Sequence, residues 1–423
     1  MTWLQRYRVR HYVANSIWIL PLFGMVAALA TSRILHWIEV VKQWESALHP
    51  DTVLAVLGTM ASSMFTFIVF VSSALLVAVQ LASGQLTPRI IAIVFKDPVT
   101  KLSLTIFTFT FTFTLAAMVR INTKVPWLTV EIAAFSCLAS LGFFLFLIDH
   151  VGKALRPSGA LRAVALLGRE VVESVYPRRL ANAPEAEPTT ELLSGQPTLT
   201  IANASNGVVL AFDDKGLVSL AERGNCVIEM VPQVGDFVAA GDPLFRIFHG
   251  GTNLAAEALQ HSVAFGQERT LEQDPCFAFR IIVDIASKGL SPAINDPTTA
   301  VLAIDQIHHL LRNVGSRRLD DGKLRDAAGK LRLVYRTPDW EDFVHLAVTE
   351  IRQFGGQSIQ IARRLRAMLE NLLLTLPEKR AAVLRQELDL LQRSAKRFFP
   401  EPEDQALANI SDFQGVGGKG GQS

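Results

Sequence analysis

Four long apolar runs within the first 150 residues constrain the fold of this chain more than any other feature. They extend over 12–32, 52–88, 102–119 and 125–148, and only the last contains a charged side chain, Glu131 near its start. A helix needs about 20 apolar residues to cross a bilayer. The pattern therefore predicts a membrane protein with an α-helical, four-span N-terminal sector.

Composition and charge separate this membrane sector from the remainder of the chain. The sequence of 423 residues is 50% hydrophobic and 19% charged, with a mean hydropathy of +0.29, which excludes a disordered chain and a protein that is soluble throughout. Residues 1–150 carry a net charge of +4 and the others −2. A near-neutral soluble sector lacks the basic surface that nucleic acid requires, so the predicted partner is the lipid bilayer.

Positive residues flanking the spans predict the orientation in the membrane. Arg6, Arg8 and Arg10 precede the first run, and further Lys and Arg residues lie between the second and third runs and after the fourth. Cytoplasmic flanks are enriched in these residues, so both termini are predicted to be cytoplasmic. The alternative is that Arg6 to Arg10 and the run 17–30 form a cleaved signal peptide, since residues 28–30 read Ala-Leu-Ala.

The second run carries a stripe of polar side chains along one side of the predicted helix. Small hydroxyl residues allow close packing between helices, and this is one explanation of the stripe. The other is that several copies of the helix surround a watery path for an ion or small polar solute, which predicts a homo-oligomer. The pore-lining candidates are Thr59, Ser62, Ser63, Thr66, Ser73 and Gln80.

Two further features of the membrane sector bear on function. Phe and Thr alternate over 107–114, but a lone strand cannot satisfy its backbone in lipid, so a helix with hydroxyl contacts to its neighbours is predicted. Glu131 lies near the outer boundary and is expected to pair with Arg120 or Lys124 across a short turn, or to act at the mouth of a pathway.

The sector after the membrane predicts an α+β organisation. The divisions expected are a four-helix transmembrane domain at 1–152, an amphipathic helix and linker at 153–198, and a small β module at 199–250. A helical module at 251–410 and a disordered tail at 411–423 follow. Short apolar segments separated by glycines predict the strands, and the stretch 234–245 resembles the strand-turn-strand of biotinyl and lipoyl carrier half-barrels. That resemblance implies a half-barrel-like shape only, because no lysine follows the turn.

Two motifs in the helical module are distinctive. They are Glu-Gln-Asp-Pro at 272–275 and Ser-Pro-Ala-Ile-Asn-Asp-Pro-Thr-Thr at 291–299. With the basic N-terminus, the four spans and the Gly-Asp-Phe-Val turn at 235–238, they resemble the predicted bacterial membrane proteins of the domain of unknown function 2254. This resemblance implies a multi-pass protein of the bacterial inner membrane, and it implies no catalytic residue.

The 291–299 motif is a proline-bounded turn that leads into a helix. Asp296 is predicted to be the N-cap, with Pro297 at the first helical position. The turn either only braces this junction or binds an anion or a carboxylate of a partner at the helix N-terminus. The ligand or partner candidates are Ser291, Asn295, Asp296, Thr298 and Thr299.

The sequence contains none of the catalytic signatures that would predict an enzyme. HExxH, GxSxG and Walker A motifs are absent, and three well-separated cysteines predict neither a disulfide framework nor a zinc site. No catalytic residue, metal or cofactor is predicted. The leading hypothesis is an oligomeric channel or solute pathway with a cytoplasmic regulatory or vestibule domain; the alternative is a ligand-binding, signalling or scaffold module that the spans only anchor.

Overall fold

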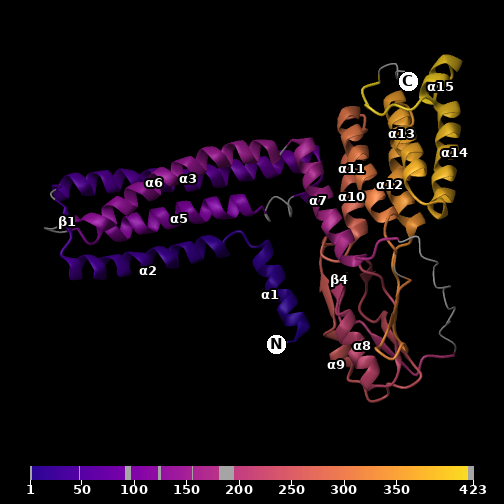
Figure 1. Ribbon diagram of the computed structural model, residues 1–423, viewed down its shortest axis with the longest axis horizontal. Helices are drawn as coiled ribbons and strands as arrows, with labels where there is room; N and C mark the ends of the chain where they lie inside the picture. The colour runs from indigo at the N-terminus through magenta and orange to yellow at the C-terminus, as the bar shows by residue number, and fades with distance from the viewer. Residues whose placement is uncertain are drawn as a thin grey trace. The chain divides into compact units, whose positions relative to one another are not determined.

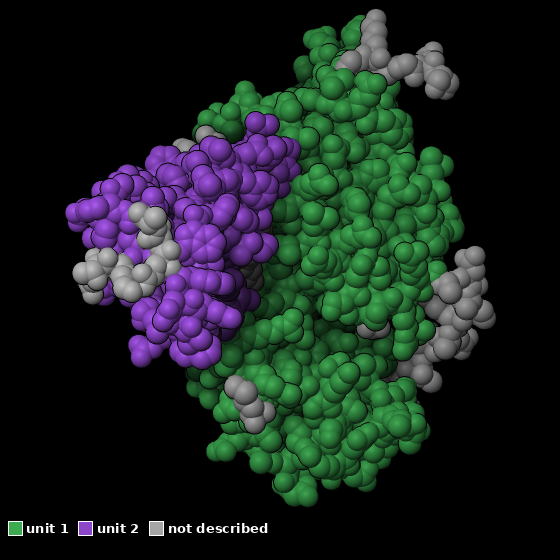
Figure 2. Space-filling view, turned by 60° about the vertical axis from the view of Figure 1, so that its left-hand side comes forward, with its two compact units in different colours: residues 1–10, 161–423 green, residues 11–160 purple. Residues whose placement is uncertain are grey.

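The computed structural model describes residues 2–46, 48–90, 97–121, 125–154, 156–180, 195–319 and 321–417. The chain forms two compact units (Figure 2): residues 11–160, called the membrane unit here, and residues 1–10 with 161–423, called the soluble unit. The N-terminal ten residues therefore belong with the part of the chain that follows the spans.

Four helices of the membrane unit are long and apolar enough to cross a bilayer. They are α2 (Ile19–Lys42), α3 (Pro50–Gln85), α5 (Pro98–Met118) and α6 (Trp127–Ala154), and a short antiparallel pair, β1 (Glu45–Ser46) and β2 (Val125–Pro126), joins two of their connections. A 3-10 turn, Pro88–Ile90, follows α3. The predicted four-span sector is confirmed, including the helical state of the Phe/Thr segment.

The predicted start of the first span at residue 12 is wrong. A separate helix, α1 (Trp3–Asn15), precedes it, and α2 begins only at Ile19. Pro21 explains the break, because proline has no backbone N–H and its ring clashes with the carbonyl four residues earlier, at Ile17. The span also extends beyond the predicted end at residue 32, to Lys42.

Helix α5 occupies the centre of the membrane unit. Asp97 caps it by accepting a hydrogen bond from the backbone N–H of Thr100, and Pro98 occupies the first turn. Phe107 and Phe113 are fully buried. A Cβ added at Gly24 of α2 would lie 2.9 Å from the carbonyl oxygen of Thr105, so glycine permits these two helices to approach closely.

The soluble unit contains a five-stranded and a three-stranded sheet. The first has the order β3 (Leu199–Ala202), β7 (Pro243–Phe248), β5 (Val227–Met230), β10 (Leu331–Tyr335) and β9 (Lys323–Arg325). Its β5–β10 pair is parallel and the other pairs are antiparallel. The second has the order β6 (Phe237–Val238), β4 (Gly207–Phe212) and β8 (Val263–Gly266), all antiparallel.

Apolar side chains from both sheets and from α8 (Asp214–Arg223) form the core of this β region. The expectation of helix throughout the chain after Gly251 was wrong for β8, β9 and β10, which complete the two sheets. These strands have three to five residues each, too few for a periodic pattern to distinguish them from loops. The described residues contain no closed barrel.

The soluble unit has other helices, most of which pack against one another. They are α7 (Pro157–Val175), α9 (Ala256–Gln260), α10 (Pro275–Gly289), α11 (Pro297–Gly315), α12 (Trp340–Phe354), α13 (Ile359–Thr375), α14 (Ala381–Phe398), α15 (Pro402–Ala408) and the 3-10 turn Glu378–Arg380. Figure 1 shows α10 to α14 side by side. Residues 411–417 lie against α13, where Asp412 accepts the N–H groups of Gly415 and Gly417; the rest of the predicted disordered tail lies outside the described residues.

Candidate functional site

The polar stripe of α3 lies on the exposed side of the helix. Thr59, Ser62, Thr66, Ser73 and Gln80 are exposed, and Ser63 is half-buried. The packed side carries apolar residues instead, among them Val53, Leu57, Ala61, Met64, Val71 and Leu75. At 100° per residue these two sets point in nearly opposite directions. The stripe is therefore not used for helix packing inside one copy of the membrane unit.

Hydroxyl groups of the stripe donate to backbone carbonyls one turn earlier on α3. Thr59 Oγ1 donates to the Ala55 carbonyl at 2.9 Å, Ser63 Oγ to Thr59 at 2.8 Å, and Thr66 Oγ1 to Ser62 at 2.9 Å. Such bonds allow serine and threonine to lie in an apolar environment. Their oxygens keep a free lone pair on the outer surface, so the stripe offers hydrogen-bond acceptors along the length of the span.

A second set of hydroxyls is buried between α5 and α6. Thr110 Oγ1 and Ser140 Oγ lie 3.0 Å apart and both residues are fully buried, while Thr114 Oγ1 donates to the Thr110 carbonyl at 2.7 Å. The contact between Thr110 and Ser140 provides the hydroxyl bond between helices that the sequence predicts for the Phe/Thr segment. The membrane unit thus uses its hydroxyls in two ways, inside on α5 and outside on α3.

The membrane unit buries a carboxylate that the sequence did not single out. Glu39 of α2 is 5% exposed, and its carboxylate accepts hydrogen bonds from the Thr129 backbone N–H and hydroxyl, each at 2.7 Å. These donors belong to the first turn of α6, where an anion is favoured. Because the predicted first span ended at residue 32, this charge was not recognised as part of a membrane helix.

Arg120 and Glu131, the two charged residues predicted to act near the membrane boundary, have different contacts. The Arg120 guanidinium donates to the carbonyl oxygen of Ser32 on α2, and Glu131 is exposed on α6. No ion pair between them occurs among the described residues, and Lys124, the other expected partner, lies outside that part of the chain. Arg120 therefore joins the end of α5 to α2 and leaves Glu131 facing outward.

The 291–299 turn is held by its own hydrogen bonds. Asp296 caps α11 by accepting from the Thr299 N–H at 3.1 Å and the Thr299 hydroxyl at 2.5 Å, and Ser291 Oγ donates to the Lys288 carbonyl. Asn295 has φ +48°, a left-handed conformation that asparagine tolerates. Thr298 and Asn295 are exposed. The predicted cap is confirmed. Ser291, Asp296 and Thr299 stabilise the turn through these hydrogen bonds.

The Glu-Gln-Asp-Pro motif joins three parts of the soluble unit. The Gln273 side chain bonds both the N–H and the carbonyl of Phe212 at the end of β4, and Asp274 caps α10. Burial raises the pKa of the Tyr7 hydroxyl on α1, and a hydrogen bond with Glu272 raises it further. The motif therefore connects the N-terminal helix, the three-stranded sheet and the helical layer.

Arg269 links this motif to the Gly-Asp-Phe-Val turn. Its Nε and Nη2 atoms lie 2.8 and 2.6 Å from Asp274 Oδ2. Burial raises the pKa of Asp274, and the Arg269 charge opposes that rise. Gly235 has φ +93°, and a Cβ there would lie 2.3 Å from Arg269 Nη2. The Glu-Gln-Asp-Pro motif and the Gly-Asp-Phe-Val turn thus meet at one ion pair, whose carboxylate is buried.

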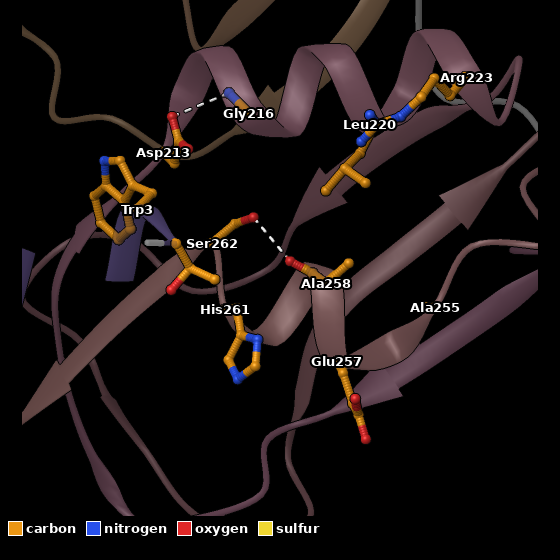
Figure 3. A pocket seen from close by; sticks show the side chains of 11 residues that line it. Trp3, Asp213, Gly216, Leu220, Arg223, Ala255, Glu257, Ala258, His261 and Ser262 are labelled. Carbon is orange, nitrogen blue, oxygen red and sulfur yellow. Dashed lines mark hydrogen bonds between the residues drawn. The ribbon is translucent and has the colours of Figure 1, made fainter. Parts of the chain in front are cut away.

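A pocket of about 430 Å³ lies between the first residues of the chain, α8 and α9. Figure 3 shows Trp3 and Asp213 at one end, His261 and Glu257 along the α9 side, and Arg223 at the far end of α8. Asp213 is engaged as the cap of α8, through the Gly216 N–H at 3.0 Å. The remaining wall offers an indole surface and side chains of both charge signs.

Metal ligands are not gathered at one place in the described part of the chain. No group of three His, Cys, Asp or Glu residues there could hold a metal ion. His308 lies 2.9 Å from the Asn371 side-chain oxygen, and burial lowers its pKa. This histidine is a partner in the packing of α11 on α13.

Four candidate spans joined to an α+β unit define a multi-span membrane protein. A family model described as "Predicted membrane protein (DUF2254)" matches residues 14–371, and the chain belongs to this family. Uncharacterized proteins of Mycobacterium bovis and Mycobacterium tuberculosis are each similar to it, with 26% identity over 424 residues that cover 95% of this chain and 80% of the relative. No solved structure matches the chain.

Proposed function

We propose that the protein is a homo-oligomer in which the α3 helices of neighbouring copies face one another and line a path for an ion or small polar solute. The carrying observation is the position of the stripe, exposed on the side of α3 opposite its packed face. Another copy would give the free hydroxyl lone pairs and the Gln80 amide a polar environment, whereas lipid offers them no donor. Closed rings of identical subunits are the common form of such assemblies.

The soluble unit then lies on one side of the membrane as a vestibule or regulatory domain. An even number of spans and the packing of Trp3, Leu4 and Tyr7 within the soluble unit support both ends of the chain on the same side. The positive residues that flank the spans favour the cytoplasmic side of a bacterial inner membrane.

Disulfide cross-linking in native membranes tests the assembly. In a Cys137→Ala background, Thr66→Cys should form a disulfide-linked dimer on oxidation. Phe65→Cys is the matched control, because it is 55% exposed and one position away, about 100° around the helix. Cross-linking at neither position, or equally at both, would contradict the α3 interface.

Conductance of the reconstituted protein tests the path itself. Thr66→Leu and Ser73→Leu replace stripe hydroxyls by apolar groups and should reduce single-channel current without dissociating the oligomer. Phe65→Leu leaves the stripe intact and should conduct like the wild type. If the wild-type oligomer assembles but carries neither a current of monovalent ions nor a flux of a small polar solute, the proposed path is refuted. The spans would then serve only as an oligomeric anchor.

The pocket in Figure 3 favours a second candidate, a membrane-anchored ligand-binding module. Because Thr2 and Trp3 contribute to its wall, a bound molecule would contact the N-terminal helix that leads to the first span. Trp3→Ala and His261→Ala should then weaken binding of a ligand recovered with the purified full chain. Equal recovery from the wild type and both variants would remove this candidate.

A further inference from the structure

Helix α1 has two apolar sides separated by arginines. Its inner side carries Trp3, Leu4 and Tyr7, which pack against Val208, Leu210 and Ala264 on β4 and β8 of the soluble unit. Its outer side carries Val9 and, farther along the same helix, Tyr12 and Val13, which are 51%, 58% and 41% exposed. At 100° per residue, Val9 points nearly opposite to Leu4 and Tyr7.

Three arginines border this outer apolar strip. Arg8 lies along one edge, and Arg6 and Arg10 lie along the other. All three are exposed, and among the contacts of the described residues none of them forms an ion pair or donates a side-chain hydrogen bond. Exposed arginines next to exposed aromatic and aliphatic side chains are suited to the headgroup region of a bilayer.

The chain itself brings this helix to the membrane. α1 ends at Asn15 and the first span begins at Ile19, so the two ends can be no more than about 15 Å apart. Trp18 and Tyr12 contact one another edge to face in this connection, and such aromatic residues are typical of the headgroup region.

We propose that the outer face of α1 binds anionic phospholipid headgroups, with Arg6, Arg8 and Arg10 as the contacts to phosphate and Val9, Tyr12 and Val13 inserted between the lipids. Arginine matches a phosphate through parallel donors, and a leaflet of anionic lipid attracts juxtamembrane arginines. The inner side of the same helix contacts β4 and β8. Binding of anionic lipid to the outer side would therefore affect the helix that packs on this sheet. This role is independent of a path along α3.

Hydrogen exchange in nanodiscs provides the test. The full chain is placed in discs of phosphatidylcholine alone or with one-third phosphatidylglycerol, and exchange is followed in a peptide covering residues 2–15. The wild type should exchange more slowly in the anionic discs. The variant Arg6→Gln/Arg8→Gln/Arg10→Gln should show the same exchange in both. The matched control Arg385→Gln/Arg393→Gln/Arg397→Gln removes three charges from α14 and should retain the wild-type difference.

Native mass spectrometry in detergent gives the affinity. Each arginine near an anionic surface contributes about 1 kcal/mol, so the triple α1 variant should bind phosphatidylglycerol about 100-fold more weakly than the wild type. Its affinity for phosphatidylcholine should not change. Equal binding of phosphatidylglycerol by wild type and variant, or an equal loss in the α14 control, would overturn the proposal. Slowed exchange of residues 2–15 by inorganic phosphate alone would also overturn it, because the site would then be for a free anion.

Discussion

Replacing Gly235 by alanine should destabilise the soluble unit far more than its turn conformation alone would predict. The new Cβ would lie 2.3 Å from Arg269 Nη2 and 2.7 Å from Asp274 Oδ2, so the guanidinium must leave the carboxylate that it pairs with. Gly241 supplies a matched control in the same turn region. Its φ of +94° nearly equals the +93° of Gly235, but a Cβ there meets no atom within 4 Å.

The expected magnitudes follow from these two environments. Placing a Cβ in the left-handed region costs about 1–2 kcal/mol, and both variants carry this cost. Removing the partner of a buried charge costs a further 3–5 kcal/mol. The Asp274 side chain is only 4% exposed but that of Arg269 is 35% exposed, so we take about 2–3 kcal/mol after solvent screening. Gly235→Ala should therefore cost about 3–5 kcal/mol and Gly241→Ala about 1–2 kcal/mol.

Chemical unfolding of the full chain in detergent, monitored by hydrogen exchange in residues 207–212 and 269–277, measures the difference in stability between the two variants. Both segments contact the ion pair or its motif, and both should lose protection in Gly235→Ala only. The double variant Gly235→Ala/Arg269→Ala should be no less stable than Gly235→Ala, because the displaced guanidinium is gone. Equal destabilisation by Gly235→Ala and Gly241→Ala would refute the role assigned to the Arg269 contact.

Substitutions at three further positions test other contacts by thermal unfolding. The hydrogen bonds from Arg280 lower the pKa of Glu350 below its ordinary 4.5; the stability that Glu350→Gln removes should be present at pH 7 and disappear as the pH falls below 4.5 through the folded-state pKa. Asn295→Gly should be near neutral and Asn295→Val should cost about 1–2 kcal/mol, since φ is +48°. Thr110→Val should cost about 0.6 kcal/mol by removing the bond to Ser140; an unchanged midpoint would show that this bond contributes nothing.

Local signals in the sequence were sufficient where a physical rule acts within a few residues. In lipid, the backbone groups of a single segment are satisfied only in a helix, so the Phe/Thr alternation of 107–114 predicted a helix. Helix α5 confirms this prediction. Aspartate followed by proline correctly predicted the start of α11 at Asp296 and Pro297. The break before α2 could also have been found, because Pro21 excludes a continuous helix through Ile17.

Contacts between distant segments were beyond such signals. β10 pairs in parallel with β5, from which it is separated by about 100 residues, and its five residues carry no pattern that names a partner. Glu39 appeared to follow a span that ended at residue 32, so its place at the N-terminus of α6 could not be predicted. The side to which the α3 stripe faces was likewise undetermined, because packing against neighbours, not periodicity, decides it.

The division of the soluble unit between the two ends of the sequence has a consequence for biosynthesis. Residues 2–10 leave the ribosome long before the strand β8, which completes their packing surface and ends at Gly266. At 5–20 residues per second, the inner side of α1 waits on the order of 10–50 s for its partner strands. During this interval Trp3, Leu4 and Tyr7 lack the apolar surface that covers them in the folded protein.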